Sequence, residues 1–353
     1  MLAFDTRPCK PTSLQKHQPG SQIDPWRQYP CLLVGRELIN HFSWSNSRAR
    51  LFSTCLRAYW WRYYAHWGGW ATNAPLEARV AYRLGKMDSL ASWAGKLVHD
   101  VIQEAIEDIR DRGRPVDGER LRVRARALLR AGWAESRRGA WIDRPKWKIN
   151  LREHYFGDDE ALSRERTDAI AHRVYSSLEG FVSGPYPDLL GRVSPGGFRN
   201  IEQLASLNLD GKTVYVKPDL AFHHPDDDML WLVDWKTGAS RAEDQLQLAT
   251  YALFARENWG VEPSNVKGVL VYLAAGEERT VPVGPADLRR AEDAIRQSMT
   301  TMLQLLDDKE RNLGSIDQFP PTDERTRCDT CNFQQLCFGT AGIPGALRAG
   351  DEE

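Results

Sequence analysis

The spacing of hydrophobic residues divides the chain into a helical first half and a second half rich in strands. Between residues 89 and 112, apolar side chains recur every three or four positions, which predicts an amphipathic helix. The same spacing predicts helices over residues 115–138 and 159–182, and Ser183-Gly-Pro185 is a stop signal for the second of these. A further helix is predicted to begin at Ser43 and to carry Cys55.

From residue 201 onward, hydrophobic and polar residues alternate, as they do in strands with one buried face. The predicted strands are residues 201–209, 213–222, 229–236 and 266–274. Asp210-Gly211 has the residue types of a tight hairpin turn between the first two strands. Helices are predicted over residues 243–258 and 285–311.

A single domain is the simplest organisation for this pattern. The chain has 353 residues, 42% of them hydrophobic and 27% charged, and shows neither an internal repeat nor a clear linker. We predict one domain over residues 41–340 with a helical insertion at about residues 113–190. Residues 1–40 are expected to form a disordered arm, and residues 341–353 a flexible tail.

The composition argues against a membrane protein or a disulfide-rich secreted protein. No stretch approaches the roughly 18 consecutive apolar residues of a membrane-spanning helix. The N-terminus lacks a basic start followed by an apolar run, and six cysteines are too sparse for a disulfide framework. We therefore expect a cytoplasmic protein with no membrane partner.

The formal net charge of −1 conceals a basic segment. Residues 110–152 hold twelve Arg and two Lys against five acidic residues, a local balance of +9. Such a segment can contact the phosphates of a nucleic acid without reading its sequence. The alternative interpretation is a solvated helical face that is rich in arginine.

An aromatic stretch precedes the first long helix. Its members are Tyr59, Trp60, Trp61, Tyr63, Tyr64, Trp67 and Trp70. Packing in a core is the expected use of these side chains, and a platform on which bases stack is the alternative.

Two acidic motifs lie on neighbouring predicted strands. The first is Val216-Lys-Pro-Asp219, and the second is Leu232-Val-Asp234-Trp-Lys236. A turn centred on residues 226–227 places Asp219 opposite Asp234, with side chains about 4.5–5.5 Å apart, and puts Lys236 on the same face. Two close carboxylates repel each other unless a cation lies between them, and oxygen ligands suit Mg²⁺ or Mn²⁺. The alternative is that these are unrelated polar residues near a turn.

Three cysteines near the C-terminus have the spacing of metal ligands. They form Cys328-x2-Cys331-x5-Cys337, and the distant Cys55 can complete a set of four. Four thiolates can hold either zinc or an iron–sulfur cluster.

Together these residues resemble the PD-(D/E)XK nuclease superfamily, in particular its RecB-like branch. That branch includes the AddB-type helicase–nuclease subunits and the CRISPR-associated adaptation nucleases with an iron–sulfur cluster. The resemblance covers residues from about 43 to 340 and implies an α/β fold, with an αβββαβ restriction-endonuclease-like core built on a central mixed sheet. Pro218 departs from the pattern, because many relatives have Gly or Ile beside the aspartate.

The resemblance also implies roles for individual residues. The implied metal ligands are His99, Asp219, Asp234 and the carbonyl of Trp235. The implied catalytic residues are Lys236, Asp234 and Asp219, with Gln247 and Tyr251 filling the family's downstream Gln-x3-Tyr motif. Glu202, on the first predicted strand, is expected to support the site. The implied ligands of a [4Fe–4S] cluster are Cys55, Cys328, Cys331 and Cys337, with zinc as the less expected occupant.

The leading hypothesis is a Mg²⁺- or Mn²⁺-dependent DNA nuclease that acts on single strands or ends as an exonuclease. No phosphate-binding Gly-x4-Gly-Lys-Ser/Thr motif is present, so such an enzyme would act alone or with a helicase partner. The alternative is a non-catalytic nucleic-acid-binding or scaffold subunit that keeps the nuclease fold. DNA or RNA as substrate, polarity, and a pathway in repair, phage defence or CRISPR adaptation all stay open.

Overall fold

The computed structural model of the chain describes residues 39–239 and 243–339. The predicted arm over residues 1–40 and the predicted tail over residues 341–353 lie outside these residues, apart from positions 39 and 40.

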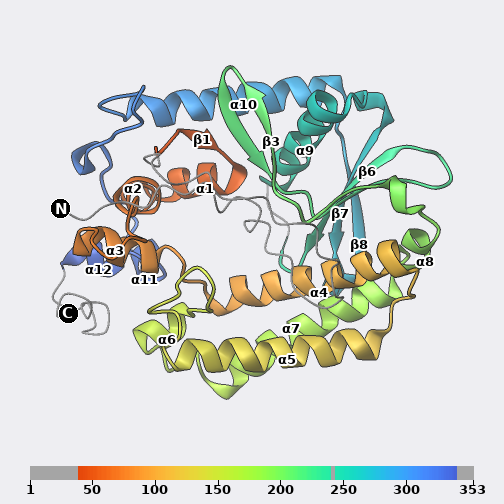
Figure 1. The fold of residues 1–353 in the computed structure, drawn as a ribbon, viewed down its shortest axis with the longest axis horizontal. Helices are drawn as coiled ribbons and strands as arrows, with labels where there is room; N and C mark the ends of the chain where they lie inside the picture. The colour runs from red at the N-terminus through yellow and green to blue at the C-terminus, as the bar shows by residue number, and fades with distance from the viewer. Residues whose placement is uncertain (1–38, 240–242, 340–353) are drawn as a thin grey trace, which may run out of the picture. The chain divides into compact units, whose positions relative to one another are not determined.

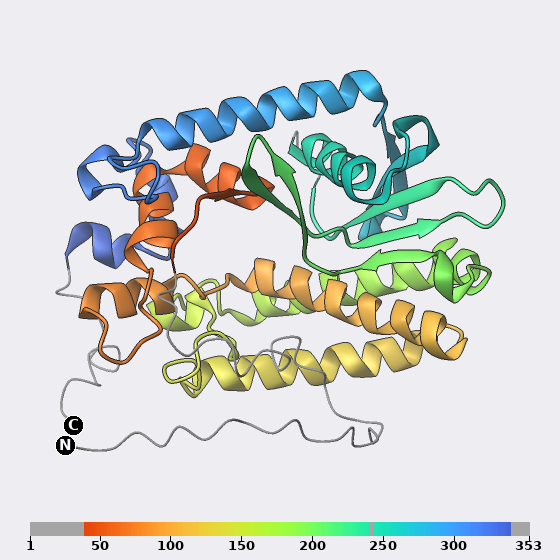
Figure 2. The same ribbon diagram turned by 45° about the horizontal axis from the view of Figure 1, so that its top comes forward.

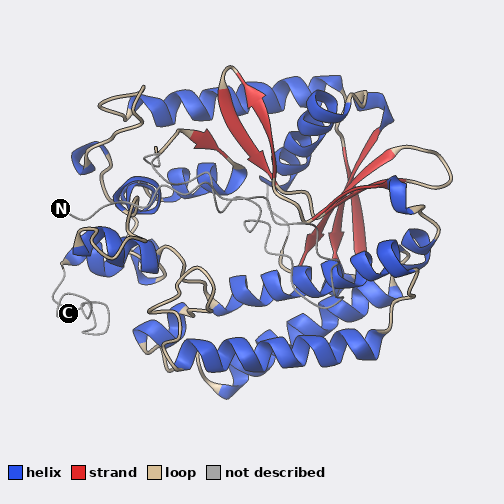
Figure 3. Cartoon of the chain, viewed as in Figure 1, coloured by secondary structure: helices blue, strands red, loops and turns tan. Residues whose placement is uncertain are grey.

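A mixed five-stranded sheet forms the centre of the fold (Figure 3). Its strands in spatial order are β2 (Phe198–Ile201), β5 (Leu220–His223), β6 (Leu230–Lys236), β7 (Val266–Tyr272) and β8 (Glu277–Val281). The pair β6–β7 is parallel, and the other neighbours are antiparallel. This arrangement confirms the predicted α/β fold with a central mixed sheet.

Helices cover both faces of this sheet (Figures 1 and 2). One face packs against α4 (Leu90–Arg112), α7 (Arg164–Ser183) and α8 (Tyr186–Gly191). The other face packs against α9 (Glu243–Trp259) and α10 (Pro285–Gln304). Helix α5 (Gly118–Arg137) lies on the outer side of α4 and α7.

The long helices follow local signals in the sequence. The Ser89 hydroxyl accepts a hydrogen bond from the Ser92 N–H and so caps the start of α4. Gly113 ends this helix in the left-handed conformation, with φ of 59°, which glycine adopts without strain. Helix α10 ends at Gln304, seven residues before its predicted end, and the backbone leaves helical geometry at Leu305.

The first two predicted strands are each broken into two. Residues 201–209 contribute to β2 and to β3 (Ala205–Leu209), and residues 213–222 contribute to β4 (Lys212–Val216) and to β5. Strands β3 and β4 belong to a second sheet with β1 (Ser43–Trp44), in the order β1-β4-β3. The predicted turn is observed, with left-handed φ of 51° at Asp210 and 74° at Gly211.

The end of the domain that carries the cysteines is helical. Its elements are α1 (Asn46–Thr54), α2 (Leu56–Trp60), the π-helix η1 (Trp61–Ala65), α3 (Leu76–Leu84), α11 (Thr326–Asp329) and α12 (Gln334–Phe338). Cys55 lies between α1 and α2 in extended geometry, with φ of −163°, so the prediction of a continuous helix through Cys55 was wrong. Trp61, Leu84 and Phe333 form the small core of this end.

The remaining short elements are α6 (Arg152–Phe156) and the 3₁₀ helices η2 (Pro195–Gly197), η3 (Pro263–Asn265), η4 (Leu273–Ala275) and η5 (Ile316–Gln318). Strand β8 was not predicted, because four of its five residues are exposed and give no alternating pattern.

Helix α7 approaches η4 closely at Gly180, and this contact generates a stability prediction. A Cβ at Gly180 would lie 1.8 Å from the carbonyl oxygen of Leu273, so one of the two segments would have to move. We expect Gly180→Ala to lower the free energy of unfolding by about 1–3 kcal/mol, measured by urea denaturation. Gly191→Ala is the matched control, since a Cβ there meets nothing within 4 Å. Equal midpoints for the two variants would contradict the close approach.

Candidate active site

The backbone leaves β geometry at two facing positions between the two sheets. Pro218 has no N–H to donate, so it interrupts strand pairing between β4 and β5. On the facing segment, Glu202 has a left-handed φ of 51°, which non-glycine residues adopt rarely and at a cost. The side chain of Asn200 supports this turn, because it accepts from the N–H of Gln203 and donates to its carbonyl.

The interruption places Glu202 directly opposite Asp219. Ile201 pairs with Leu220 before the gap, and the register resumes unchanged in the pairing of β3 with β4 after it. The N–H of Glu202 donates to the carbonyl of Asp219 at 3.1 Å. Both carboxylates therefore project from the same interruption, and both side chains are nearly buried.

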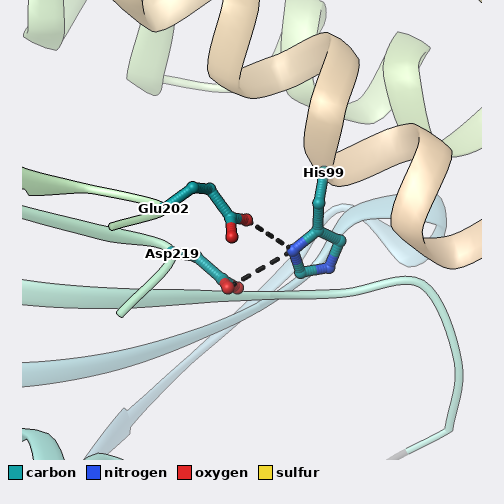
Figure 4. A group of neighbouring side chains, drawn as sticks. All are labelled: His99, Glu202 and Asp219. Atoms are coloured by element: carbon teal, nitrogen blue, oxygen red, sulfur yellow. Dashed lines mark hydrogen bonds and ion pairs between the residues drawn. The ribbon is translucent and has the colours of Figure 1, made fainter. Parts of the chain in front are cut away.

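His99 reaches these two carboxylates from helix α4 (Figure 4). Its Nδ1 lies 2.9 Å from Glu202 Oε1 and 3.3 Å from Asp219 Oδ1. One ligand atom from each of the three residues lies within 4.8 Å of the others. Oxygen ligands bind Mg²⁺ or Ca²⁺ at about 2.0–2.6 Å, so donor atoms at this spacing can share one ion.

Asp234 and Lys236 form the neighbouring part of the site, at the end of β6. The predicted register is confirmed over four residue pairs, from Leu220 with Val233 to His223 with Leu230. Asp219 lies one position before the first of these pairs, and its Oδ2 accepts from the N–H of Trp235 at 2.7 Å. That bond joins the backbone beside Asp234 to the carboxylate that faces His99.

The ammonium group of Lys236 contacts three side chains. Its Nζ lies 2.6 Å from Asp234 Oδ2 and 3.0 Å from Asp244 Oδ1, and it donates to Gln247 Oε1 at 3.2 Å. Gln247 Nε2 approaches the Tyr251 hydroxyl at 2.6 Å, and this hydroxyl donates to the carbonyl of Lys217 at 2.9 Å. Helix α9 is thereby tied to the interruption in the hairpin.

The charges of these groups are strongly shifted by burial and by one another. Burial, and then the charge of Asp219, raise the pKa of Asp234 to about 7. Burial would also raise the pKa of Asp219, but the charge and hydrogen bond of His99 outweigh it and lower this pKa. Burial alone would lower the pKa of His99, yet Asp219 and Glu202 raise it well above its ordinary value.

The arrangement fits a divalent cation. Three nearly buried carboxylates meet here, from Glu202, Asp219 and Asp234. Asp234 Oδ2 is buried and, apart from its ion pair with Lys236, has no hydrogen-bond partner among the described residues. Carboxylate oxygens with one imidazole suit Mg²⁺ or Mn²⁺, whose charge would offset the repulsion between them.

The structure places most of the sequence-predicted residues around one point but groups them in two sets. His99 and Asp219 meet with Glu202, which sequence reasoning had given only a supporting place. Asp234 meets with Lys236, and Gln247 and Tyr251 follow it in one line of hydrogen bonds. Metal binding by Asp234 and by the carbonyl of Trp235 stays a prediction.

Asp244 was missed by sequence reasoning. It is buried in the first turn of α9 and forms an ion pair with Lys236. Acidic residues are common in the first turn of a helix because they complement its dipole, so the type of residue gave no signal. Its position three residues before Gln247, on the same helical face, was the available signal.

The four predicted cysteines also come together. Cys55, Cys328, Cys331 and Cys337 are free thiols that line one cavity of about 360 Å³. The N–H of Ala58 donates to Cys55 Sγ at 3.5 Å, and the N–H of Phe333 donates to Cys331 Sγ at 3.4 Å. Burial is the main cause that raises the pKa of Cys331 to about 12. The hydrogen bond from the Phe333 N–H opposes this shift, and the three other cysteines add to it.

This cavity fits a thiolate-bound group. Bound metal would stabilise the thiolates, and N–H groups aimed at the sulfurs are the supporting contacts expected around such ligands. One tetrahedral zinc ion would draw four sulfurs to about 3.8 Å from one another, since each Zn–S bond is about 2.3 Å. The cavity also extends over Arg62, Asn332 and Phe338, so its volume exceeds the space between the four sulfurs.

Some arginines of the basic segment over residues 110–152 form ion pairs with acidic residues of α4. Arg112 and Arg120 both pair with the buried Asp108 of α4, and Arg124 pairs with Glu104 at 2.7 Å. Arg126 and Arg130 are exposed on α5 and have no ion pair within the described residues. Contact of this surface with phosphates stays a prediction.

Comparison with known proteins assigns the chain to a family. The sequence model of the PD-(D/E)XK nuclease superfamily matches residues 43–338. No curated protein matches the chain. Among the described residues, no helix has the length and apolar character needed to cross a membrane.

The raised pKa of His99 generates a prediction about metal binding. Below this pKa the imidazole carries a proton that a metal ion must displace, so binding should release protons and strengthen as pH rises. We expect Mn²⁺ affinity to rise by about tenfold per pH unit for each proton displaced near neutral pH. Calorimetric titration in two buffers of different ionisation enthalpy measures the protons released. His99→Ala should release fewer protons, and equal heats in both buffers for the parent chain would contradict the assignment.

Proposed function

Because the chain belongs to the PD-(D/E)XK nuclease superfamily, we propose that it is a metal-dependent DNA nuclease that hydrolyses phosphodiester bonds. One observation carries the proposal. His99, Glu202 and Asp219 converge within 4.8 Å, beside the ion pair of Asp234 with Lys236. A cation site next to a lysine can activate water and stabilise the charge that develops during phosphodiester hydrolysis.

The proposed metal ligands are His99, Glu202, Asp219 and Asp234, with the Trp235 carbonyl as a further candidate. A bound Mg²⁺ or Mn²⁺ would supply an activated water and polarise the phosphate. The interruption at Pro218 and Glu202 holds two of the carboxylates before any ion arrives, so little reorganisation is needed on binding. That preorganisation is what makes electrostatic stabilisation effective.

Lys236 contributes a fixed positive charge. Burial by itself would lower its pKa, but Asp234 and Asp244 outweigh this and raise the pKa above its ordinary value. We propose that the charged amine donates hydrogen bonds to the phosphate or the attacking water. Gln247, itself hydrogen-bonded to Tyr251, restrains the amine in this position.

We further propose that the enzyme belongs to the RecB-like branch and cuts single strands or ends of DNA. The support is the resemblance of the helical His99 and of Gln247-x3-Tyr251 to the pattern of that branch. His99 lies beside the carboxylates and Gln247 beside the lysine. A helicase is the kind of partner that would present such ends. A non-catalytic scaffold is disfavoured, because it has no need for three costly buried carboxylates.

The second cofactor that we propose is a [4Fe–4S] cluster held by Cys55, Cys328, Cys331 and Cys337. Such a cluster would be structural, because it would join segments that lie about 270 residues apart. By the estimate used for disulfides, closing a loop of this length removes roughly 5–6 kcal/mol of unfolded-chain entropy. That is comparable with the whole stability of a typical domain, about 5–15 kcal/mol.

An assay on end-labelled DNA tests the nuclease proposal. With Mg²⁺ or Mn²⁺, the parent chain should cut single-stranded and double-stranded substrates to different extents. Asp234→Ala and Lys236→Ala should each lower the rate by at least about 100-fold, because the first removes a proposed metal ligand and the second removes the positive charge that would contact the phosphate. Lys212→Ala, on the β3–β4 hairpin, is the matched control and should retain full activity. Cleavage that persists in both site variants would overturn the proposal.

Spectroscopy of a cysteine variant tests the proposed cluster. The parent chain should absorb near 400 nm, which iron–sulfur clusters do and zinc does not. Cys331→Ala should lose this band and melt at a lower temperature, since a structural closure is lost. Cys31→Ala, at a cysteine without an assigned role, should keep both the band and the melting temperature. Unchanged melting of Cys331→Ala would contradict a structural cluster.

A further inference from the structure

The aromatic stretch between residues 59 and 70 divides into two parts with different environments. Tyr59 and Trp61 are fully buried, which matches the expected role in core packing. Trp67 and Trp70 instead lie on the surface, with 37% and 43% of each residue exposed. Single exposed aromatic residues are common, but exposed aromatic residues that lie together are a feature of binding surfaces.

These two tryptophans belong to a surface that we call the aromatic platform, formed by Trp67, Trp70, Tyr82 and His66. The rings of Trp67 and Trp70 meet edge to face with centroids 5.1 Å apart, and Trp70 lies 5.9 Å from Tyr82. His66 stacks on Tyr82 at 6.2 Å, with the two planes only 8° apart. The contacts hold the rings in fixed positions, so little side-chain entropy would be lost when a ligand stacks on them.

Positive charge gathers beside the platform. Lys86 Nζ lies 5.1 Å from the centre of the Tyr82 ring. Burial, and then the charges of Arg62, Lys146 and Lys96, lower the pKa of Lys86 to about 8. An anion bound beside Lys86 would offset the repulsion that its ammonium group meets from the other three cations.

Lys146 and Trp147 add a further positive charge and a further exposed aromatic ring. Lys146 Nζ lies 4.9 Å from the ring of Trp147, which is 62% exposed. The positive charge of Lys96 is partly offset by an ion pair, since its Nζ lies 2.6 Å from Asp88 Oδ1. Basic side chains interleaved with exposed aromatic rings are the composition of surfaces that bind single-stranded nucleic acid.

Helix α4 connects one of these cations with the candidate active site. Lys96 and His99 are three residues apart on α4, so they occupy neighbouring positions on one face of that helix. A strand that contacts Lys86 and then Lys96 would reach His99 within one further helical turn, about 5.4 Å.

We propose that the aromatic platform and its four cations, Arg62, Lys86, Lys96 and Lys146, bind single-stranded nucleic acid and lead it to the metal centre. Unpaired bases stack on Trp67 and Trp70, and the cations contact the phosphates. A duplex offers the same phosphates but keeps its bases paired and stacked, so it cannot use the tryptophans. The inference rests on the proposed nuclease function, for which it names the surface that binds the single-stranded substrate.

Binding without cleavage tests this inference. Fluorescence anisotropy of a labelled 20-nucleotide oligothymidine is measured in EDTA, beside a duplex of the same length. Trp67→Ala/Trp70→Ala should weaken binding of the single strand by at least about tenfold, given the usual contribution of base–aromatic stacking. Duplex binding should change little. Tyr215→Ala is the matched control, because this aromatic residue on β4 is also 43% exposed and should leave both affinities unchanged.

A second arm of the experiment examines the cations. The logarithm of the binding constant falls linearly with the logarithm of the salt concentration. In Lys86→Gln/Lys146→Gln the slope of this line should become less steep by about 0.7 for each phosphate contact that is lost. Arg192→Gln, at an exposed arginine paired with Asp226 outside the arginine-rich segment, is its control. Trp70→Tyr keeps an aromatic face and should bind like the parent chain, which separates lost stacking from a folding defect.

The outcomes distinguish this inference from the proposed function. Unchanged single-strand binding in the double tryptophan variant would overturn the inference, even if the enzyme cuts DNA. Equal losses of single-strand and duplex binding would also overturn it, because a duplex cannot stack on the rings. Tryptophan-dependent binding by a protein that cuts nothing would support the platform and contradict the nuclease proposal.

Discussion

Concentrated negative charge at an interruption in a hairpin is the constraint around which this domain is organised. Glu202, Asp219 and Asp234 are nearly buried, and carboxylates in such positions are costly unless cations offset their charge. The surroundings supply cations from three directions. Lys217 pairs with Glu202 at 2.6 Å, Lys236 pairs with Asp234 at 2.6 Å, and His99 contacts the other two carboxylates.

Each of the two helical layers brings side chains of the site to that interruption. Helix α4 packs on one face of the sheet and carries His99, while α9 packs on the other face and carries Asp244, Gln247 and Tyr251. The small core of the cysteine-bearing end then supports α3, on which Tyr82 and part of the aromatic platform lie. The charge centre, the helices that complete it and the platform are thus connected through packing.

The sequence allowed the composition of the site to be predicted, but not its exact grouping. The hairpin register followed from the turn near residue 226, because pairing in an antiparallel sheet extends residue by residue from the turn. The break at Pro218 could not be placed in the same way. Alternation continues through it. The left-handed conformation of Glu202 is supported locally by the turn bonds of Asn200, but its pairing with Asp219 on the facing segment is a tertiary contact. Asp244 was missed for a similar reason, since its role depends on burial beside Lys236.

Diffraction from crystals soaked in Mn²⁺, with data collected at the manganese absorption edge, tests the central claim most directly. The account predicts one strong anomalous peak within bonding distance of His99, Glu202 and Asp219, and next to Asp234. A fully occupied manganese site elsewhere, apart from the iron and sulfur signal expected at the four cysteines, would contradict the account. So would the absence of any peak at millimolar Mn²⁺, with the carboxylates still paired to Lys217 and Lys236.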